Sequence, residues 1–193
     1  MIETRLAPGL LLAMPQLVDP NFGRAVVLML EHNDEGSFGL IINRPLDELT
    51  ADELLESMDI EWRGDPDTAV WSGGPVMPRT GWILHEPLGP IPETDATIGG
   101  AETILVAPDL ALSSSRDALQ TIASEPPERM RLILGYSGWG PGQLAQEMAR
   151  GSWLHADADL DLIFETPAED MWEGALRSLG IDPQTIIQGF GVH

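Results

Sequence analysis

Short apolar runs separated by turn residues dominate the first half of the chain. Residues 9–14 form one continuous apolar run that ends before proline, which predicts a buried strand. Residues 24–31 and 38–43 are rich in aliphatic and β-branched side chains and flank a turn at residues 33–36, which predicts an antiparallel hairpin. Shorter runs of the same kind predict strands at residues 68–72, 81–85, 96–98 and 103–107.

Helical patterns are interleaved with these strands and dominate the second half. Thr50 and Glu53 form a capping-box sequence, in which the hydroxyl and the carboxylate each satisfy an N–H at a helix start. Apolar residues three to four positions apart predict helices at residues 113–123, 141–150 and 167–179, with a helical turn at 182–188. Strands are predicted at residues 131–134 and 160–164. Together these patterns indicate the α+β class with a mixed sheet.

The length of 193 residues suits one compact domain, because a chain of this size buries roughly 70% of the surface that it exposes when unfolded. The sequence contains no repeat, low-complexity tract or linker, so we expect a single domain over residues 1–193. Its apolar runs are shorter than the roughly 20 residues of a membrane span, and its start does not resemble a signal peptide. We therefore expect a cytoplasmic protein without a membrane partner.

The charge is strongly unbalanced. The chain has 31 acidic and 10 basic side chains, the latter all arginine, and its formal net charge is −21. Such a surface repels phosphate backbones, which disfavours direct DNA binding. Residues 47–61 and 157–173 each hold seven carboxylates, for which a solvated acidic face is favoured over a metal or a cationic partner. The absence of cysteine excludes disulfides, thiolate metal sites and a cysteine nucleophile.

The most distinctive segment is GYSGWGPGQL at residues 135–144, between a predicted strand and a predicted helix. Its glycines predict a strand-to-helix turn that exposes N–H groups at the helix start. They do not follow the spacing of the dinucleotide fingerprint, and the chain lacks the lysine of a P-loop. A nucleophile elbow needs glycine where Trp139 stands, so Ser137 is interpreted as a turn residue. A weak anion site at the helix start remains an alternative.

The four histidines show no metal-ligand spacing. His32 and His85 lie at predicted strand ends beside a glutamate, but neighbouring residues on a strand point to opposite faces. A hydrogen-bonded structural role is therefore favoured over a general base for both. No metal, cofactor or catalytic residue is predicted.

Two further strand ends, at residues 43–45 and 73–75, are polar or rich in glycine. If the sheet brings them beside residues 138–143, they form a crevice for a protein partner or a small ligand. Arg44 and Arg79 then offer cations to an anionic group, and surface ion pairs are an equally supported interpretation. The predicted ligand- or partner-binding residues are Asn43, Arg44, Gly73, Gly74, His85, Gly138, Trp139, Gly140, Gly142 and Gln143.

Several motifs follow one another along almost the whole chain. They are GLLLAMP with DPNF, EHN with GLIINRP, GGPV with LH, the segment at residues 135–144 with Glu147 and Trp153, and IF with Trp172 and LGI. In these motifs the chain resembles the AlgH/YqgE family, also called uncharacterised protein family 0301. The family motif has alanine where this chain has Ser137, which further weakens a serine nucleophile.

The resemblance implies a compact α+β domain whose mixed, mostly antiparallel sheet is bent or bifurcated, partly barrel-like and flanked by about four helices. No catalytic activity is established for the family, and some members carry a name that denotes transcriptional regulation of alginate synthesis. We therefore predict a non-enzymatic partner- or ligand-binding protein with an indirect regulatory role. The alternative is an enzyme acting on a small anionic or phosphorylated molecule, with His85 or His32 as base and the amides of residues 138–143 holding the anion.

Overall fold

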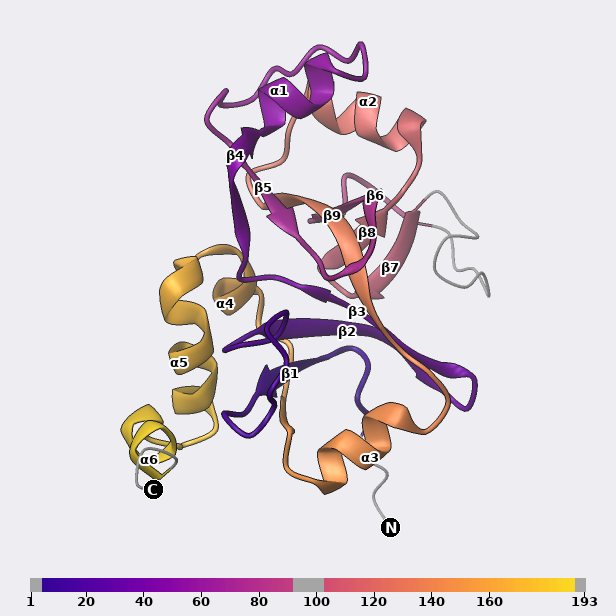
Figure 1. Cartoon of the computed structure of the whole chain (residues 1–193). Helices are drawn as coiled ribbons and strands as arrows, with labels where there is room; N and C mark the ends of the chain where they lie inside the picture. Colours follow the sequence, from indigo (N-terminus) through magenta and orange to yellow (C-terminus); the bar gives the residue numbers. More distant parts are fainter. Residues whose placement is uncertain (1–4, 92–102, 190–193) are drawn as a thin grey trace. The chain divides into compact units, whose positions relative to one another are not determined.

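The computed structural model describes residues 5–91 and 103–189 (Figure 1). These residues form ten strands and six helices, which confirms the α+β class. The strands are β1 (Gly9–Ala13), β2 (Val26–Asn33), β3 (Gly36–Ile41), β4 (Pro45–Thr50), β5 (Ala69–Ser72), β6 (Val76–His85), β7 (Thr103–Ala107), β8 (Leu110–Ser113), β9 (Met130–Trp139) and β10 (Trp153–Ala156). The helices are α1 (Ala51–Glu56), α2 (Arg116–Ser124), α3 (Gln143–Ala149), α4 (Leu160–Phe164), α5 (Ala168–Ser178) and α6 (Pro183–Gly189).

The described chain divides into two compact units. Unit 1 comprises residues 5–44, 73–76 and 136–189. Unit 2 comprises residues 45–72, 77–91 and 103–135. The single domain expected from the chain length stays a prediction.

The sheet of unit 1 is antiparallel, in the strand order β10-β1-β2-β3-β9. β1 is buried at all five positions, as its continuous apolar run predicts. β2 and β3 form the predicted hairpin, in which Asn33 pairs with Gly36. Helix α5 lies alongside β1, and the indole N–H of Trp172 donates to the carbonyl oxygen of Ala13 at 2.9 Å (Figure 1).

The sheet of unit 2 is mixed. β5 pairs antiparallel with β4 and parallel with β9, and the order continues through β6 and β8 to β7. Helices α1 and α2 lie side by side (Figure 1), and their Leu55 and Ile122 pack in one buried cluster with Val70 and Leu132 of the strands. The predicted capping box starts α1. The mixed, mostly antiparallel sheet is therefore confirmed.

Strand β9 corrects the interpretation of the glycine-rich segment. It continues to Trp139, so residues 135–139 are strand and only residues 140–142 form the turn. Gly135 has a φ of 75°, a left-handed conformation that glycine adopts at little cost. The strand changes partner there, because residues 132–134 pair with β5 and residues 137–139 pair with β3. The backbone hydrogen bonds of this segment are thus used in the sheet on both sides of Gly135.

Other elements also differ from the sequence patterns. Residues 160–164, predicted as a strand, form helix α4, because the Asp159 carboxylate accepts the backbone N–H groups of Asp161 and Leu162. The strand before Pro45 ends at Ile41, as expected, but Pro45 also begins the unpredicted strand β4, a position that requires no N–H donor. β4, β8 and β10 were not predicted, and the described residues contain six helices rather than about four.

The strand expected at residues 96–98 lies outside the described residues. The longest helix, α5, has 11 residues. In the described part of the chain no helix combines the length and the apolar character that crossing a membrane requires.

Candidate functional site

Gly73 and Gly74 lie where β3 and β9 meet in unit 1. The carbonyl oxygen of Gly73 accepts the N–H of Ile41 at 2.8 Å and the hydroxyl of Ser137 at 3.0 Å. Gly74 has a φ of 145°, and a Cβ there would lie far inside the contact distances of Tyr136 O and Ser137 Oγ. Glycine is therefore required at position 74, and the fully buried Ser137 holds this junction rather than facing a substrate.

Asn43 and Arg44, which follow β3, bond to the start of β2 and to the segment that precedes it. The Asn43 side chain accepts the N–H of Val26 and donates to the carbonyl oxygen of Arg24, both at 2.9 Å. Arg44 Nη2 donates to the carbonyl oxygen of Gly23 at 2.8 Å. Both side chains thus replace backbone hydrogen bonds that this irregular segment cannot make to itself.

Trp139, Gly140 and Gln143 belong to a hydrogen-bonded cluster centred on Glu147 of α3. Glu147 Oε2 accepts the indole N–H groups of Trp139 at 3.0 Å and Trp153 at 2.8 Å. Its Oε1 accepts from the Gln143 amide at 3.0 Å, and Gln143 Oε1 in turn accepts the N–H of Gly140 at 3.0 Å. Both oxygens of this half-buried carboxylate are therefore committed within unit 1.

The same indole rings form an aromatic core. Phe22 stacks on Trp139 with ring centres 6.2 Å apart and meets Trp153 edge-on at 5.4 Å. Trp139 and Trp153 themselves pack edge to face at 5.7 Å. Such arrangements add packing energy beyond burial, so the distinctive tryptophan of the glycine-rich segment stabilises unit 1.

Some of the backbone N–H groups of residues 138–143, which were predicted to hold an anion, already donate hydrogen bonds within the chain. The N–H of Gly140 is taken by Gln143, and the N–H of Gln143 donates to the carbonyl oxygen of Gly140 at 3.1 Å. Gly142 is the N-cap of α3 with a φ of 72°, and Gly138 lies on β9 opposite Phe38. The binding role of the nine predicted residues in unit 1 stays a prediction.

His85, the tenth predicted residue, lies in unit 2 at the end of β6. Its Nδ1 is 2.8 Å from the carbonyl oxygen of Glu86, which only accepts, so Nδ1 carries a proton. In the neutral ring Nε2 then accepts the hydroxyl of Ser113 at 2.8 Å. The Ser113 oxygen lies 2.6 Å from Thr103 Oγ1, which completes a chain of three side chains whose members His85 and Ser113 are buried.

Burial shifts two titrating groups in unit 2. It lowers the pKa of His85 below the ordinary 6.5, although the hydrogen bond and the charge of Glu86 act in the opposite direction. His85 is therefore neutral at neutral pH. Burial also lowers the pKa of Arg131 to about 10. Arg131 stays charged at neutral pH, and its guanidinium lies 3.8 Å from the ring centre of Trp71.

A pocket of about 300 Å³ lies in unit 2 among α1, α2, β6 and β9. Its volume is at the lower end of the range of small-molecule sites. The apolar lining consists of Leu54, Met58, Trp82, Ile83, Leu119, Leu132, Ile133 and Leu134. Gly81 and four polar residues, Arg79, Ser114, Ser115 and Arg116, complete it.

The charge of this lining contrasts with that of the chain. Two arginines and no carboxylate line the pocket of a protein whose formal net charge is −21. Arg116 Nη2 donates to the carbonyl oxygen of Met58 at 2.6 Å and so connects the start of α2 to the end of α1. The exposed Arg79 side chain forms no hydrogen bond or ion pair with the described residues, so its donors are available to a ligand.

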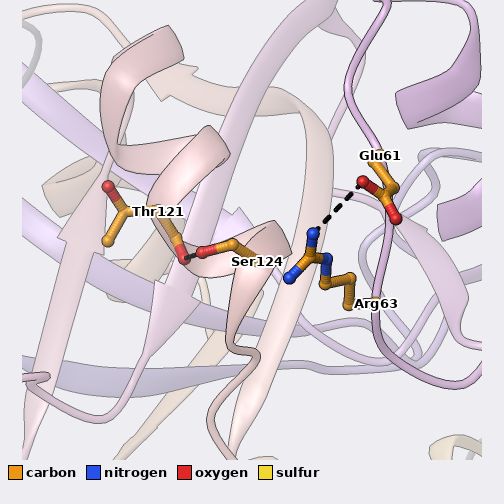
Figure 2. A network of polar contacts seen from close by, with 4 residues as sticks. All are labelled: Glu61, Arg63, Thr121 and Ser124. Carbon is orange, nitrogen blue, oxygen red and sulfur yellow. Dashed lines mark hydrogen bonds and ion pairs between the residues drawn. The ribbon is translucent and has the colours of Figure 1, made fainter.

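The other end of α2 is held by contacts that do not involve the pocket. The N–H of Arg63 donates to the carbonyl oxygen of Ala123 at 3.0 Å, and Ser124 Oγ donates to that of Thr121 at 2.8 Å. Figure 2 shows the Ser124 contact together with the ion pair between Arg63 and Glu61, whose side chains are 61% and 76% exposed. An ion pair this exposed contributes little to stability, which makes Arg63 a suitable control residue.

Sequence patterns did not reveal the pocket. Its apolar residues come from four elements, and each element contributes residues that the patterns assign to an ordinary core stripe. Of its residues only Arg79 stood out, as a cation on an acidic chain. His32, the other candidate base, is exposed and contacts Ser37 Oγ at 2.7 Å. Residues 5–91 and 103–189 contain no group of three or more histidines and carboxylates suited to a metal ion.

Comparison with known proteins places the chain in a family. A family model described as AlgH-like matches residues 10–184. The chain belongs to this family. An AlgH-like relative from Myxococcus xanthus (strain DK1622), named UPF0301 protein, is 43% identical over 189 residues, or 97% of this chain and 98% of the relative. A UPF0301 protein from Bordetella petrii is 44% identical over 184 residues, or 94% of this chain and 86% of the relative.

Solved structures agree with the AlgH-like fold. The solution structure of the AlgH protein from Pseudomonas aeruginosa superposes with a TM-score of 0.74 at 32% identity and covers 100% of this chain and 98% of that one. A crystal structure of a Corynebacterium diphtheriae protein has a TM-score of 0.69 at 23% identity, covers 90% and 87% of the two chains, and supports the fold alone. The resemblance to the AlgH/YqgE family is confirmed.

Proposed function

We propose that this AlgH-like protein is a non-enzymatic protein that binds a small ligand in the pocket of unit 2. The observation that carries the proposal is the pocket itself, a mostly apolar hollow with an available arginine. Small-molecule sites generally combine apolar walls with a few polar groups that orient the ligand. In unit 1 the corresponding polar groups, those of Asn43, Arg44 and Gln143, already bond within the fold.

A regulatory role then follows through the ligand. The protein is proposed to act in the cytoplasm, where the bound and empty forms differ in their contacts with a protein partner. Any influence on transcription is indirect in this scheme, because a net charge of −21 opposes contact with DNA phosphates. A gel shift that is sensitive to salt and occurs with the pure protein would contradict the indirect route.

Blocking the pocket tests the proposed function. A Cβ at Gly81 would meet only Leu134 Cδ2, at 3.8 Å, so the backbone accepts a side chain there and Gly81→Leu occupies part of the pocket. Gly89→Leu is the matched control, because a Cβ at position 89 would meet no atom within 4 Å beyond its chain neighbours and the position does not line the pocket.

The measurement is a thermal-shift screen of a small-fragment library that contains neutral and charged compounds. Ligands that bind the folded state raise its melting temperature. We expect fragments that stabilise the wild type and Gly89→Leu but not Gly81→Leu. A screen in which every stabilising fragment acts equally on Gly81→Leu, or in which none stabilises the wild type, contradicts the proposal.

An enzyme acting on a small anionic molecule is the second candidate. The hydrogen bond between His85 Nε2 and the Ser113 hydroxyl favours it, because a neutral imidazole that accepts a serine proton can act as its base. The exposed fractions of 3% for His85 and 1% for Ser113 favour the binding protein instead. If the protein hydrolyses nitrophenyl esters or phosphates and Ser113→Ala abolishes this hydrolysis, the enzyme would be favoured over the binding protein.

A further inference from the structure

We propose that the ligand of the unit 2 pocket is an amphipathic carboxylate, a single medium-length acyl chain with a negatively charged head. This inference rests on the proposed function and adds the chemical class of the ligand. It follows from the two kinds of surface that the pocket brings together.

The walls of the pocket suit an apolar tail. Leu54 lines it from α1, Met58 from the turn after α1 and Leu119 from α2, while Ile83 and Leu132 line it from the strands. Each methylene moved from water into such surroundings strengthens binding about fourfold. A volume of about 300 Å³ favours one short tail over a sterol or a two-chain lipid.

The polar lining suits an anion. None of the thirteen lining residues is acidic, although the chain has 31 carboxylates. The planar guanidinium of Arg79 offers paired N–H donors that match a carboxylate. Ser114 and Ser115 also line the pocket, and the Ser115 oxygen, which accepts the N–H of Ala118 at the start of α2, keeps its own O–H for the head.

Arg79 is the more suitable of the two arginines. One donor of Arg116 is already bonded to the carbonyl oxygen of Met58, so this side chain holds α1 and α2 together. Arg79 bonds to no described residue, so meeting a ligand breaks no bond to residues 5–91 or 103–189. Its position on β6 also places it on the same strand as Ile83, which lines the apolar wall.

Isothermal titration of the full-length protein with octanoate, 1-octanol and acetate tests the ligand class. We expect octanoate to bind most tightly, 1-octanol about tenfold or more weakly, and acetate weakest, because only octanoate uses both tail and head. Arg79→Gln should weaken octanoate binding about tenfold or more, the usual effect of losing a charge-assisted hydrogen bond, and leave 1-octanol unchanged. Arg63→Gln removes an exposed arginine of the same unit outside the pocket and should change neither.

The outcomes separate this inference from the proposed function. Equal binding of 1-octanol and octanoate, with no effect of Arg79→Gln, would overturn the carboxylate class while the pocket remains a binding site. Binding of octanoate that Gly81→Leu leaves unchanged would place the anion elsewhere and overturn the inference. No binding of any probe would overturn the inference, while the fragment screen with Gly81→Leu still decides whether the pocket binds a ligand. Circular dichroism of Arg79→Gln verifies folding, and partial recovery by Arg79→Lys supports the need for the charge.

Discussion

The glycine-rich junction of unit 1 and the pocket of unit 2 differ in how their polar groups are used. In unit 1 the groups of Asn43, Arg44 and Glu147 are bonded to the fold. In unit 2 Arg79 stands beside an apolar hollow and bonds to no described residue. A conspicuous motif therefore need not be the place where a ligand finds available donors. The comparison can be tested through stability in unit 1 and through binding in unit 2.

The largest loss of stability is expected for Gly74→Ala. Its Cβ would overlap the backbone of Tyr136 and strain a φ of 145°, so the free energy of unfolding should fall by on the order of 3 kcal/mol. Urea unfolding measures this. Gly89→Ala, where no atom lies within 4 Å, should change it by less than about 0.5 kcal/mol. Equal stabilities of the two variants would show that position 74 does not require glycine.

A smaller loss is expected for Glu147→Ala. The change leaves the indole N–H groups of Trp139 and Trp153 without their acceptor, which should cost about 2 kcal/mol. The exposed neighbour Gln146 gives the control Gln146→Ala, for which less than about 0.5 kcal/mol is expected. Urea unfolding of both variants, with tryptophan fluorescence as the probe, tests the difference. A fully stable Glu147→Ala would mean that this cluster does not hold unit 1 together.

His85 should make stability depend on pH. Its folded pKa is lowered, so well above pH 6.5 it is neutral in both states and contributes no pH dependence. As the pH falls below 6.5 the unfolded chain takes up the proton first, and stability is lost until the lowered folded pKa is reached. The stability advantage of the wild type over His85→Gln should therefore shrink as the pH falls from about 7 through 6.5. A constant difference across this range would show that the His85 pKa is not lowered by folding.

The smallest effect on stability is expected for Arg79→Gln. Arg79 is exposed and has no partner among the described residues, so the free energy of unfolding should change by less than about 0.5 kcal/mol. Urea unfolding checks this beside the titration with octanoate. A loss above about 1 kcal/mol would mean that Arg79 serves the fold, as the polar groups of unit 1 do.

Local patterns predicted much of the fold. The hairpin of β2 and β3 and the capping box of α1 depend on neighbours in sequence, which a pattern contains. The prediction of a strand at residues 160–164 was wrong, because the Asp159 cap outweighs a short alternation of apolar and polar residues. The continuation of β9 through Gly135 was not predicted, because its two partners, β5 and β3, are distant in sequence. Pairing with strands distant in sequence determines the secondary structure of such segments, and their glycine content alone does not.

The candidate site was predictable only in part. The sequence identified Arg79 as an unusual cation, but not the apolar residues beside it. Leu54, Met58 and Leu119 follow the same spacing as any core stripe, and only the packing of α1 and α2 leaves a hollow between them. Glycines such as Gly73 and Gly74 stood out because backbone strands approach closely there, which is a property of the fold.

A nitrogen–proton correlation spectrum of the labelled full-length protein, titrated with octanoate, tests the comparison most directly. If the pocket is the binding site, the amide signals that move first belong to its lining, such as those of Gly81, Ser115 and Leu132, while those of residues 138–143 stay in place. Movement of the signals of residues 138–143, with the pocket signals unchanged, would contradict the account and return the glycine-rich segment to the position of candidate site.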